Sequence, residues 1–208
     1  MMYKDNQNGR SMVEMMGYLM VVMGVIIAMG RIVSSAFDNH KYSTASLQLT
    51  ELVNAMVKAS AIDYDYSEVV NKIKTADGAK ELAPNTYRVV GTDIYHAFGG
   101  KVTVATADEN TKLVITYEKL SKKQCVELAM KDWRKNQYAD LFSVKVNDTY
   151  WYWVAYGNNE GGAVTLDEGK CSGSTCALPM RRSALTGVGD NDGQCTDSRN
   201  NTITWTFN

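Results

Sequence analysis

The sequence predicts an α+β protein in which one long N-terminal helix packs on an antiparallel β-sheet. No Pro or Gly occurs over residues 31–62, and apolar residues there recur at the spacing of a helix face. Farther along, residues 101–106 and 112–117 alternate between polar and apolar side chains, as half-buried strands do. The chain has 208 residues, a length that suits one domain with an appendage.

The N-terminal part combines a polar start with an uncharged apolar run. Residues 15–30 carry no charge, and Arg31 ends the run. A bilayer crossing needs ~20 residues, so residues 11–13 and 32–37 are expected to contribute. Glu14 lies directly before the run. Because a carboxylate facing lipid costs ~2.5 kcal/mol or more, Glu14 must lie near the headgroups, be protonated or be paired.

The helical pattern continues beyond Arg31 and becomes amphipathic. Its apolar positions are Leu49, Leu52, Val53, Met56 and Val57, with polar residues between them. We therefore expect a single helix of roughly fifty residues, about 75 Å long. One half would lie in a membrane or a bundle of partner helices, and the other would pack on a globular head. Such a helix is hard to explain in a soluble enzyme.

The remaining elements follow from caps, turns and alternation. Ser67 and Ser121 are candidate N-caps for helices over residues 67–75 and 121–135. The predicted strands cover residues 87–90, 101–106, 112–117, 141–146, 150–155 and 202–207, and the Gly-rich stretch 157–193 is predicted to be mostly loop. The aromatic cluster at 150–153 alternates between the two faces of its strand. It would form either a sugar-binding patch or buried sheet packing, and we favour the packing.

The four cysteines behind a candidate export signal indicate two disulfides in an oxidising compartment. They allow three connectivities. A zinc site is the alternative, but only Cys171 and Cys176 are close in sequence, and His40 and His96 lie far from them. Residues 190–193, with Asp190 and Asp192, begin like a calcium loop but lack the third acidic ligand and the distal Glu. A solvated acidic turn is therefore expected, and no metal.

Several functional classes find no support in the sequence. The formal net charge is −1, so no basic face indicates a nucleic-acid partner. No nucleophile elbow, phosphate-binding glycine loop, His-Glu-x-x-His or Cys-x-x-Cys motif is present. We therefore predict neither an enzyme nor a cofactor.

The stretch over residues 8–30 resembles the cleavage and assembly signal of type IV prepilins. In that family a short polar leader ends in Gly, a prepilin peptidase cuts after it, and the fifth mature residue is Glu. On this sequence the leader is 1–9, the cut falls between Gly9 and Arg10, and Glu14 is the fifth residue. A secretory signal peptide cut near residues 28–30 and an uncleaved anchor are the alternatives.

The second half resembles the globular head of type IVb pilins, the class of toxin-coregulated and conjugative thin pili. The resemblance lies in FGGKVTV, the strand LVITYEKLS, the helix that starts near Cys125, and Cys195 before the terminal TITWTFN. It implies that Cys125 pairs with Cys195, which leaves Cys171 and Cys176 to close a small local loop. It also implies a C-terminal region, bounded by the first disulfide, on an antiparallel sheet.

The resemblance implies a structural pilus subunit with a leader (1–9), an apolar half-helix for membrane and filament core (10–37), and a head (38–208). Its partners would be prepilin peptidase, the assembly machinery and further copies in a helical filament. The head would lie in the periplasm before assembly and outside the cell afterwards, with a methylated new N-terminus at Arg10. A minor pilin, a type II secretion pseudopilin and a membrane-anchored binding module are the alternatives.

Overall fold

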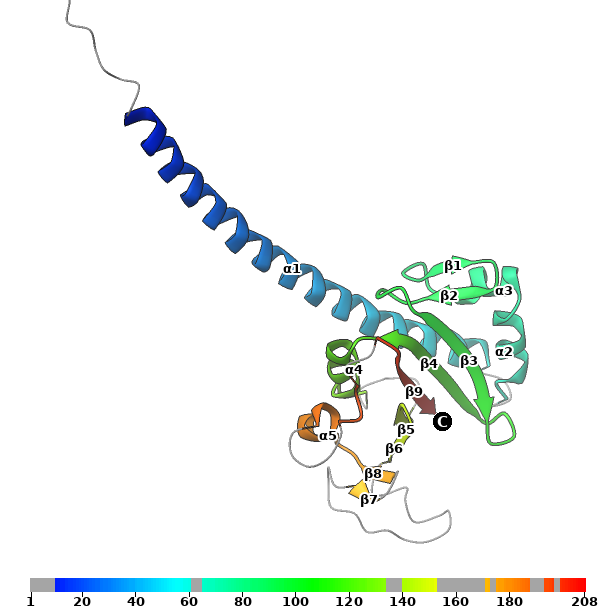
Figure 1. Ribbon diagram of the computed structural model, residues 1–208. Helices are drawn as coiled ribbons and strands as arrows, with labels where there is room; N and C mark the ends of the chain where they lie inside the picture. Colours follow the sequence, from blue (N-terminus) through cyan, green and yellow to red (C-terminus); the bar gives the residue numbers. More distant parts are fainter. Residues whose placement is uncertain are drawn as a thin grey trace, which may run out of the picture. The chain divides into compact units, whose positions relative to one another are not determined.

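The computed structural model describes residues 10–60, 65–133, 140–152, 171–172, 175–187, 193–196 and 199–208 (Figure 1). It divides into two units, residues 1–41 and 42–208. The α+β fold class is confirmed: an apolar N-terminal helix, a mainly antiparallel sheet and a disulfide in the C-terminal region are all present.

Helix α1, Arg10–Ala59, is 50 residues long, as the uninterrupted helical pattern predicts. In the first unit, the stretch Met12–Gly30 is long and apolar enough to cross a membrane, and none of it is buried. In the second unit, the same helix buries one stripe at three-and-four spacing: Ala45, Leu49, Leu52, Val53 and Met56. The predicted apolar face is confirmed, except that Val57 is only partly buried.

Two short helices follow, where the sequence predicted one. These are α2, Ser67–Ile73, and α3, Ala76–Leu82. Thr75 separates them because its backbone is extended and its side chain accepts a hydrogen bond from the Gly78 amide. The predicted N-cap at Ser67 is wrong. Instead, an Asp65 carboxylate oxygen accepts a hydrogen bond from the Ser67 amide at 2.7 Å. This exposed hydrogen bond lowers the pKa of Asp65.

The nine-stranded sheet has the order β1-β2-β3-β4-β9-β5-β6-β8-β7 in the described residues, and Figure 1 shows the C-terminal β9 beside β4 and β5. The strands are β1 Arg88–Val90, β2 Asp93–Tyr95, β3 Lys101–Ala107, β4 Lys112–Leu120, β5 Leu141–Val146, β6 Thr149–Tyr152, β7 Cys171–Ser172, β8 Thr175–Ala177 and β9 Asn201–Phe207. Every pairing is antiparallel except that of β6 with β8.

One face of the sheet forms a single core with the buried stripe of α1. Its central strands contribute every second residue: Val102 and Val104, Leu113, Ile115 and Tyr117, Val144 and Val146, Trp151, and Ile203, Trp205 and Phe207. This is the alternation that the sequence predicted for β3, β4, β6 and β9, whereas β5 buries both Ser143 and Val144. Trp151 is fully buried and Tyr150 is 39 % exposed, so the aromatic cluster at 150–153 divides between the core and the outer face as far as Tyr152. Trp153 lies outside the described residues.

Helix α4, Lys122–Ala129, begins as predicted, because Ser121 and Gln124 form a capping box. It ends six residues before the predicted 135. The Trp133 indole Nε1 donates to the Leu128 carbonyl at 3.1 Å and so satisfies a carbonyl of the last turn. Trp133 is buried after the helix rather than in it.

The predicted loop 157–193 contains regular structure that its composition did not indicate. Strands β7 and β8 and helix α5, Arg182–Thr186, lie within it. Leu185 of α5 is fully buried in the core. A long-range contact therefore orders a segment that is locally polar and rich in glycine.

Gln48 fastens α1 to two loops of the head. It is 1 % exposed, its Nε2 donates to the Thr86 carbonyl at 2.5 Å, and its Oε1 accepts the Ala97 amide at 2.9 Å. Because both ends of one amide are used, this side chain fixes the rotation of the helix relative to the loops before β1 and after β2.

We expect Gln48→Ala to lower the free energy of unfolding of the second unit by about 1–3 kcal/mol, because the Ala97 amide and the Thr86 carbonyl lose their partner. The measurement is urea unfolding of the full chain in non-ionic detergent. Leu47→Ala is the matched control, since the neighbouring Leu47 is 50 % exposed, and it should change stability by less than about 0.5 kcal/mol. Equal effects of the two variants would contradict the role of Gln48.

Candidate functional site

The candidate site at the N-terminus comprises Gly9, Arg10 and Glu14. Gly9 lies outside the described residues. Arg10 is the first residue of α1, and Glu14 is the fifth and is exposed. The exposed apolar stretch Met12–Gly30 surrounds and follows Glu14. A carboxylate therefore stands near the start of a helix whose other side chains suit lipid or further apolar helices.

The glycines of this stretch leave the helix surface open. A Cβ added at Gly17, Gly24 or Gly30 would meet nothing within 4 Å outside the helix's own backbone. Small residues on an apolar helix allow close approach of a second helix.

The disulfide Cys125–Cys195 joins the first half of α4 to the segment that precedes β9. Its Cα atoms are 5.8 Å apart and both residues are fully buried. This is the pairing that the type IVb resemblance implies. The two cysteines are 70 residues apart, and closing a loop of that size stabilises the fold by roughly 4 kcal/mol in the chain-entropy model.

The other two cysteines lie on paired strands. The register of β7 and β8 places Cys171 opposite Cys176, and Cys176 is buried and disulfide-bonded. The side chain of Cys171 lies outside the described residues, as do Asp190 and Asp192 of the calcium-like turn. Within the described ranges, no group of three or more His, Cys, Asp or Glu residues could hold a metal ion.

Asn201, at the start of β9, is the centre of a buried hydrogen-bond network. It is fully buried, and its Nδ2 donates to the Leu120 and Thr196 carbonyls, both at 3.0 Å. Its Oδ1 accepts the Thr196 amide at 2.7 Å and the Asn147 side-chain amide at 3.0 Å. One side chain thereby joins β4, the segment after Cys195 and the β5–β6 turn.

Asn147 extends this network to the second cysteine pair. It occupies the left-handed conformation (φ 50°) in the β5–β6 turn, and its Nδ2 also donates to the Gln194 carbonyl at 2.6 Å. The Gln194 side chain accepts the Trp151 indole N–H at 2.7 Å and lies 3.6 Å from the Cys176 sulfur. These buried hydrogen bonds therefore connect the segment beside Cys195 with the region of Cys176.

Sequence reasoning missed Asn147 and Asn201. Asn147 is the first residue of the Asn-x-Thr triplet 147–149, and Asn201 is the middle residue of the triplet 200–202; this pattern gives no information about burial. The sequence does carry a local signal for Asn147, because Asn in a tight turn favours the left-handed conformation that this residue adopts. Nothing local distinguishes Asn201 from its exposed neighbour Asn200.

His96 lies in a buried aromatic and backbone pocket. It is 3 % exposed, stacks on Tyr117 with 4.7 Å between ring centroids, and bonds through Nε2 to the Glu118 carbonyl at 2.9 Å. Its Nδ1 accepts the Phe98 amide at 3.2 Å, so the ring is neutral with its proton on Nε2. Burial lowers the pKa of His96, although the bond to the Glu118 carbonyl opposes this shift.

Gly100 makes this pocket possible by close approach. A Cβ at Gly100 would lie 1.9 Å from the Glu118 carbonyl oxygen and 2.4 Å from His96 Nε2. Beside it, the Tyr87 and Tyr117 hydroxyls bond to each other at 2.6 Å, and burial raises the pKa of both. These groups remain neutral near pH 7 and form a structural network with no nucleophile or base facing solvent.

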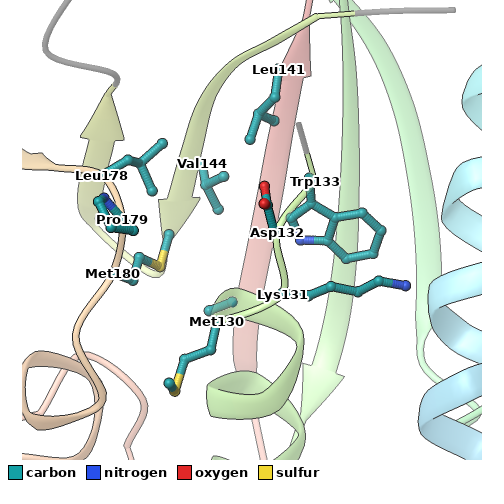
Figure 2. A pocket seen from close by; sticks show the side chains of 10 residues that line it. Met130, Lys131, Asp132, Trp133, Leu141, Val144, Leu178, Pro179 and Met180 are labelled. Atoms are coloured by element: carbon teal, nitrogen blue, oxygen red, sulfur yellow. The ribbon is translucent and has the colours of Figure 1, made fainter. Parts of the chain in front are cut away.

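A small hollow lies where α4 ends, next to β5 (Figure 2). Figure 2 shows Met130 and Trp133 on one side and Leu178, Pro179 and Met180 on the other. The volume of this hollow is about 60 Å³, whereas small-molecule pockets typically span about 300–1,000 Å³. The hollow is too small for a cofactor.

Comparison with known proteins identifies a protein family. The model of a protein family described as PilS N terminal matches residues 42–208, the same range as the second structural unit. No curated protein matches the chain significantly.

We expect Asn201→Ala to destabilise the second unit by on the order of 3 kcal/mol, because several buried donors and acceptors would lose their partner. Asn208→Ala is the matched control: Asn208 follows the same strand but is exposed, so its replacement should cost less than about 0.5 kcal/mol. Urea unfolding in detergent measures both. A loss below about 1 kcal/mol for Asn201→Ala would contradict a central role for this network.

We also expect acid to destabilise the second unit through His96. The folded state holds the pKa of His96 below its ordinary 6.5. Above pH 6.5 the ring is therefore neutral in both the folded and the unfolded state, and His96 causes no loss of stability. Below pH 6.5 the unfolded chain takes up a proton that the folded protein does not. Stability should then fall by up to about 1.4 kcal/mol per pH unit until the folded pKa is reached.

The comparison of two histidine variants isolates this effect. His96→Gln should reduce the slope of unfolding free energy between pH 6.5 and 5, whereas His40→Gln should preserve it, because His40 is exposed. The measurement is urea unfolding at a series of pH values. An unchanged slope in His96→Gln would show that other groups cause the acid sensitivity.

Proposed function

Because the chain belongs to the PilS N-terminal family, a family of pilin-related domains, we propose that it is the structural subunit of a type IV pilus filament. The family match covers the head, residues 42–208. The observation that carries the proposal is the helix that leaves this head as an exposed apolar stretch, Met12–Gly30. None of that stretch is buried among the described residues, and its apolar side chains favour lipid or further apolar helices.

Two environments meet this requirement in succession. Before assembly, the stretch holds the subunit in the inner membrane with its head in the periplasm. After assembly, the same stretch lies in a bundle of identical helices at the core of an extracellular filament. The exposed residues include Met12, Leu19, Ile26 and Ile27, each more than half exposed, and either environment would bury them.

Processing by prepilin peptidase between Gly9 and Arg10 gives Glu14 its role. The cut creates a positive amine at Arg10, four residues and ~6 Å along the helix axis from Glu14. In the low dielectric of a helix bundle, an unpaired carboxylate is costly. The amine of one subunit neutralises Glu14 of its neighbour, so the charge is satisfied only when the two helices have the correct axial register.

We propose the class of pilus from features of the head. A disulfide that spans 70 residues and bounds the C-terminal region, with β9 in the middle of the sheet, supports the type IVb-like class. A minor pilin or a type II secretion pseudopilin would share the N-terminal signal. The abundance of the subunit in purified filaments distinguishes a major pilin from both.

We expect Glu14→Val to be cleaved normally and to reduce filament yield at least tenfold, because the neighbouring amine loses its partner. Glu68→Ala, which removes an exposed carboxylate from α2, is the matched control and should leave the yield unchanged. The measurements are the amount of sheared filament and the intact mass of the membrane-bound subunit. Normal filament yield from Glu14→Val would exclude this assembly mechanism.

N-terminal sequencing of the protein from membranes, with and without prepilin peptidase, tests the first step. A start at Arg10 only in the presence of the peptidase supports the proposal, and a mass increase of one methyl group would identify the methylated terminus. A start near Arg31 would instead indicate ordinary signal peptidase and a secreted head. An intact Met1 despite active peptidase would indicate a membrane-anchored binding module.

A further inference from the structure

The outer face of the sheet, opposite the core, carries a continuous row of side chains. The strand registers pair Thr103 with Thr116, Thr116 with Thr204, Thr204 with Lys145, and Lys145 with Tyr150. One row therefore crosses β3, β4, β9, β5 and β6. With neighbouring strands ~4.8 Å apart, it extends over about 19 Å. We call these five residues the outer row.

The threonine part of the row presents hydroxyl groups on the outer face. Thr103 is exposed, and Thr116 and Thr204 are half-buried. The Thr116 and Thr204 hydroxyls bond to each other at 2.8 Å, and Thr103 donates to Glu118 at 3.3 Å. A hydroxyl can donate one hydrogen bond and accept two, so these groups retain capacity for a polar ligand.

The other end of the row is aromatic and positively charged. Tyr150 is 39 % exposed, and its ring plane is 12° from that of Tyr152, with 6.0 Å between the ring centroids. The Lys145 ammonium lies 4.9 Å from the Tyr150 centroid. Phe142 meets the edge of Tyr152, and Lys112 lies 3.4 Å over the Phe142 ring, so an aromatic line continues beyond the row.

The lysines of this face differ in how their charge is balanced. Lys112 pairs with Asp108, and Lys101 pairs with Asp93 at 2.8 Å. In the described part of the chain, Lys145 forms no ion pair, and its cation–π contact with Tyr150 leaves its charge uncompensated. The aromatic end of the outer row is therefore a site of positive potential beside an exposed ring.

We propose that the outer row binds an extended acidic polysaccharide. Sugar C–H groups stack on the electron-rich face of Tyr150, sugar hydroxyls bond to the threonine hydroxyls, and a sugar carboxylate pairs with Lys145. The length of the row favours a chain over a single sugar, because repeated weak contacts along ~19 Å supply the affinity that a pocket would otherwise provide.

The chemistry of the row distinguishes this ligand from a protein partner. Stable protein interfaces have a core of large apolar and aromatic side chains. The outer row has threonines at three of its five positions, with the aromatic ring at one end. The inference needs only the folded second unit and does not depend on filament assembly.

The test is a binding measurement on the full chain in non-ionic detergent, with polygalacturonate as the acidic probe and dextran of similar length as the neutral one. We expect polygalacturonate to bind and dextran to bind at least tenfold more weakly. Tyr150→Ala should weaken polygalacturonate binding about tenfold, whereas Tyr150→Phe, which keeps the ring, should bind normally. Lys145→Gln should weaken binding and also reduce its dependence on salt.

Val90→Ala is the control for surface substitution, because Val90 is 56 % exposed on β1 at the far edge of the sheet, and it should bind as the unaltered protein does. Absence of polygalacturonate binding, or equal binding by Tyr150→Ala, would overturn the proposal. Equal binding of dextran and polygalacturonate would overturn the acidic ligand. Self-association that Tyr150→Ala abolishes, without binding of either polysaccharide, would make this face an interface between copies.

Discussion

The position of β9 is the constraint on which the head depends. The last strand of the chain is hydrogen-bonded to β4 on one side and β5 on the other, so both halves of the sheet meet on it. Its inward residues, Ile203, Trp205 and Phe207, are buried against the core. The sheet is therefore complete only when the C-terminus has inserted. The Cys125–Cys195 disulfide and the Asn201 network hold the segment that precedes this strand.

The buried polar side chains of this fold form hydrogen bonds mainly with backbone groups of loops and strand ends. Gln48 satisfies backbone groups at residues 86 and 97, His96 those at 98 and 118, and Asn201 those at 120 and 196. Each of these backbone groups lies outside or at the end of a strand ladder and would be costly to bury alone. Amide and imidazole side chains thus permit irregular segments to close tightly over an apolar core.

Helix α1 is continuous, but its N-terminal and C-terminal parts have side chains suited to two different environments. Over Met12–Gly30 its apolar side chains are exposed on all sides, whereas within the second unit only one stripe is apolar and buried. A helix that is apolar all round suits lipid or a helix bundle, and an amphipathic helix suits the surface of a sheet. The change occurs without a Pro or Gly between residues 31 and 62, so the helix itself is not interrupted.

The sequence by itself determined those features whose signal is local: the length of α1, the period-two strands β3, β4 and β9, the N-cap at Ser121, and the position of Glu14 beside an apolar run. Only the tertiary structure decided four features: the separation of α2 from α3 at Thr75, the end of α4 before Trp133, the formation of α5 around the buried Leu185, and the roles of Asn147 and Asn201. Each of these depends on a partner that is distant in sequence or on a cap that competes with helix continuation. Periodicity and propensity describe a residue and its neighbours, whereas burial of an amide or an indole depends on which strand comes to lie beside it.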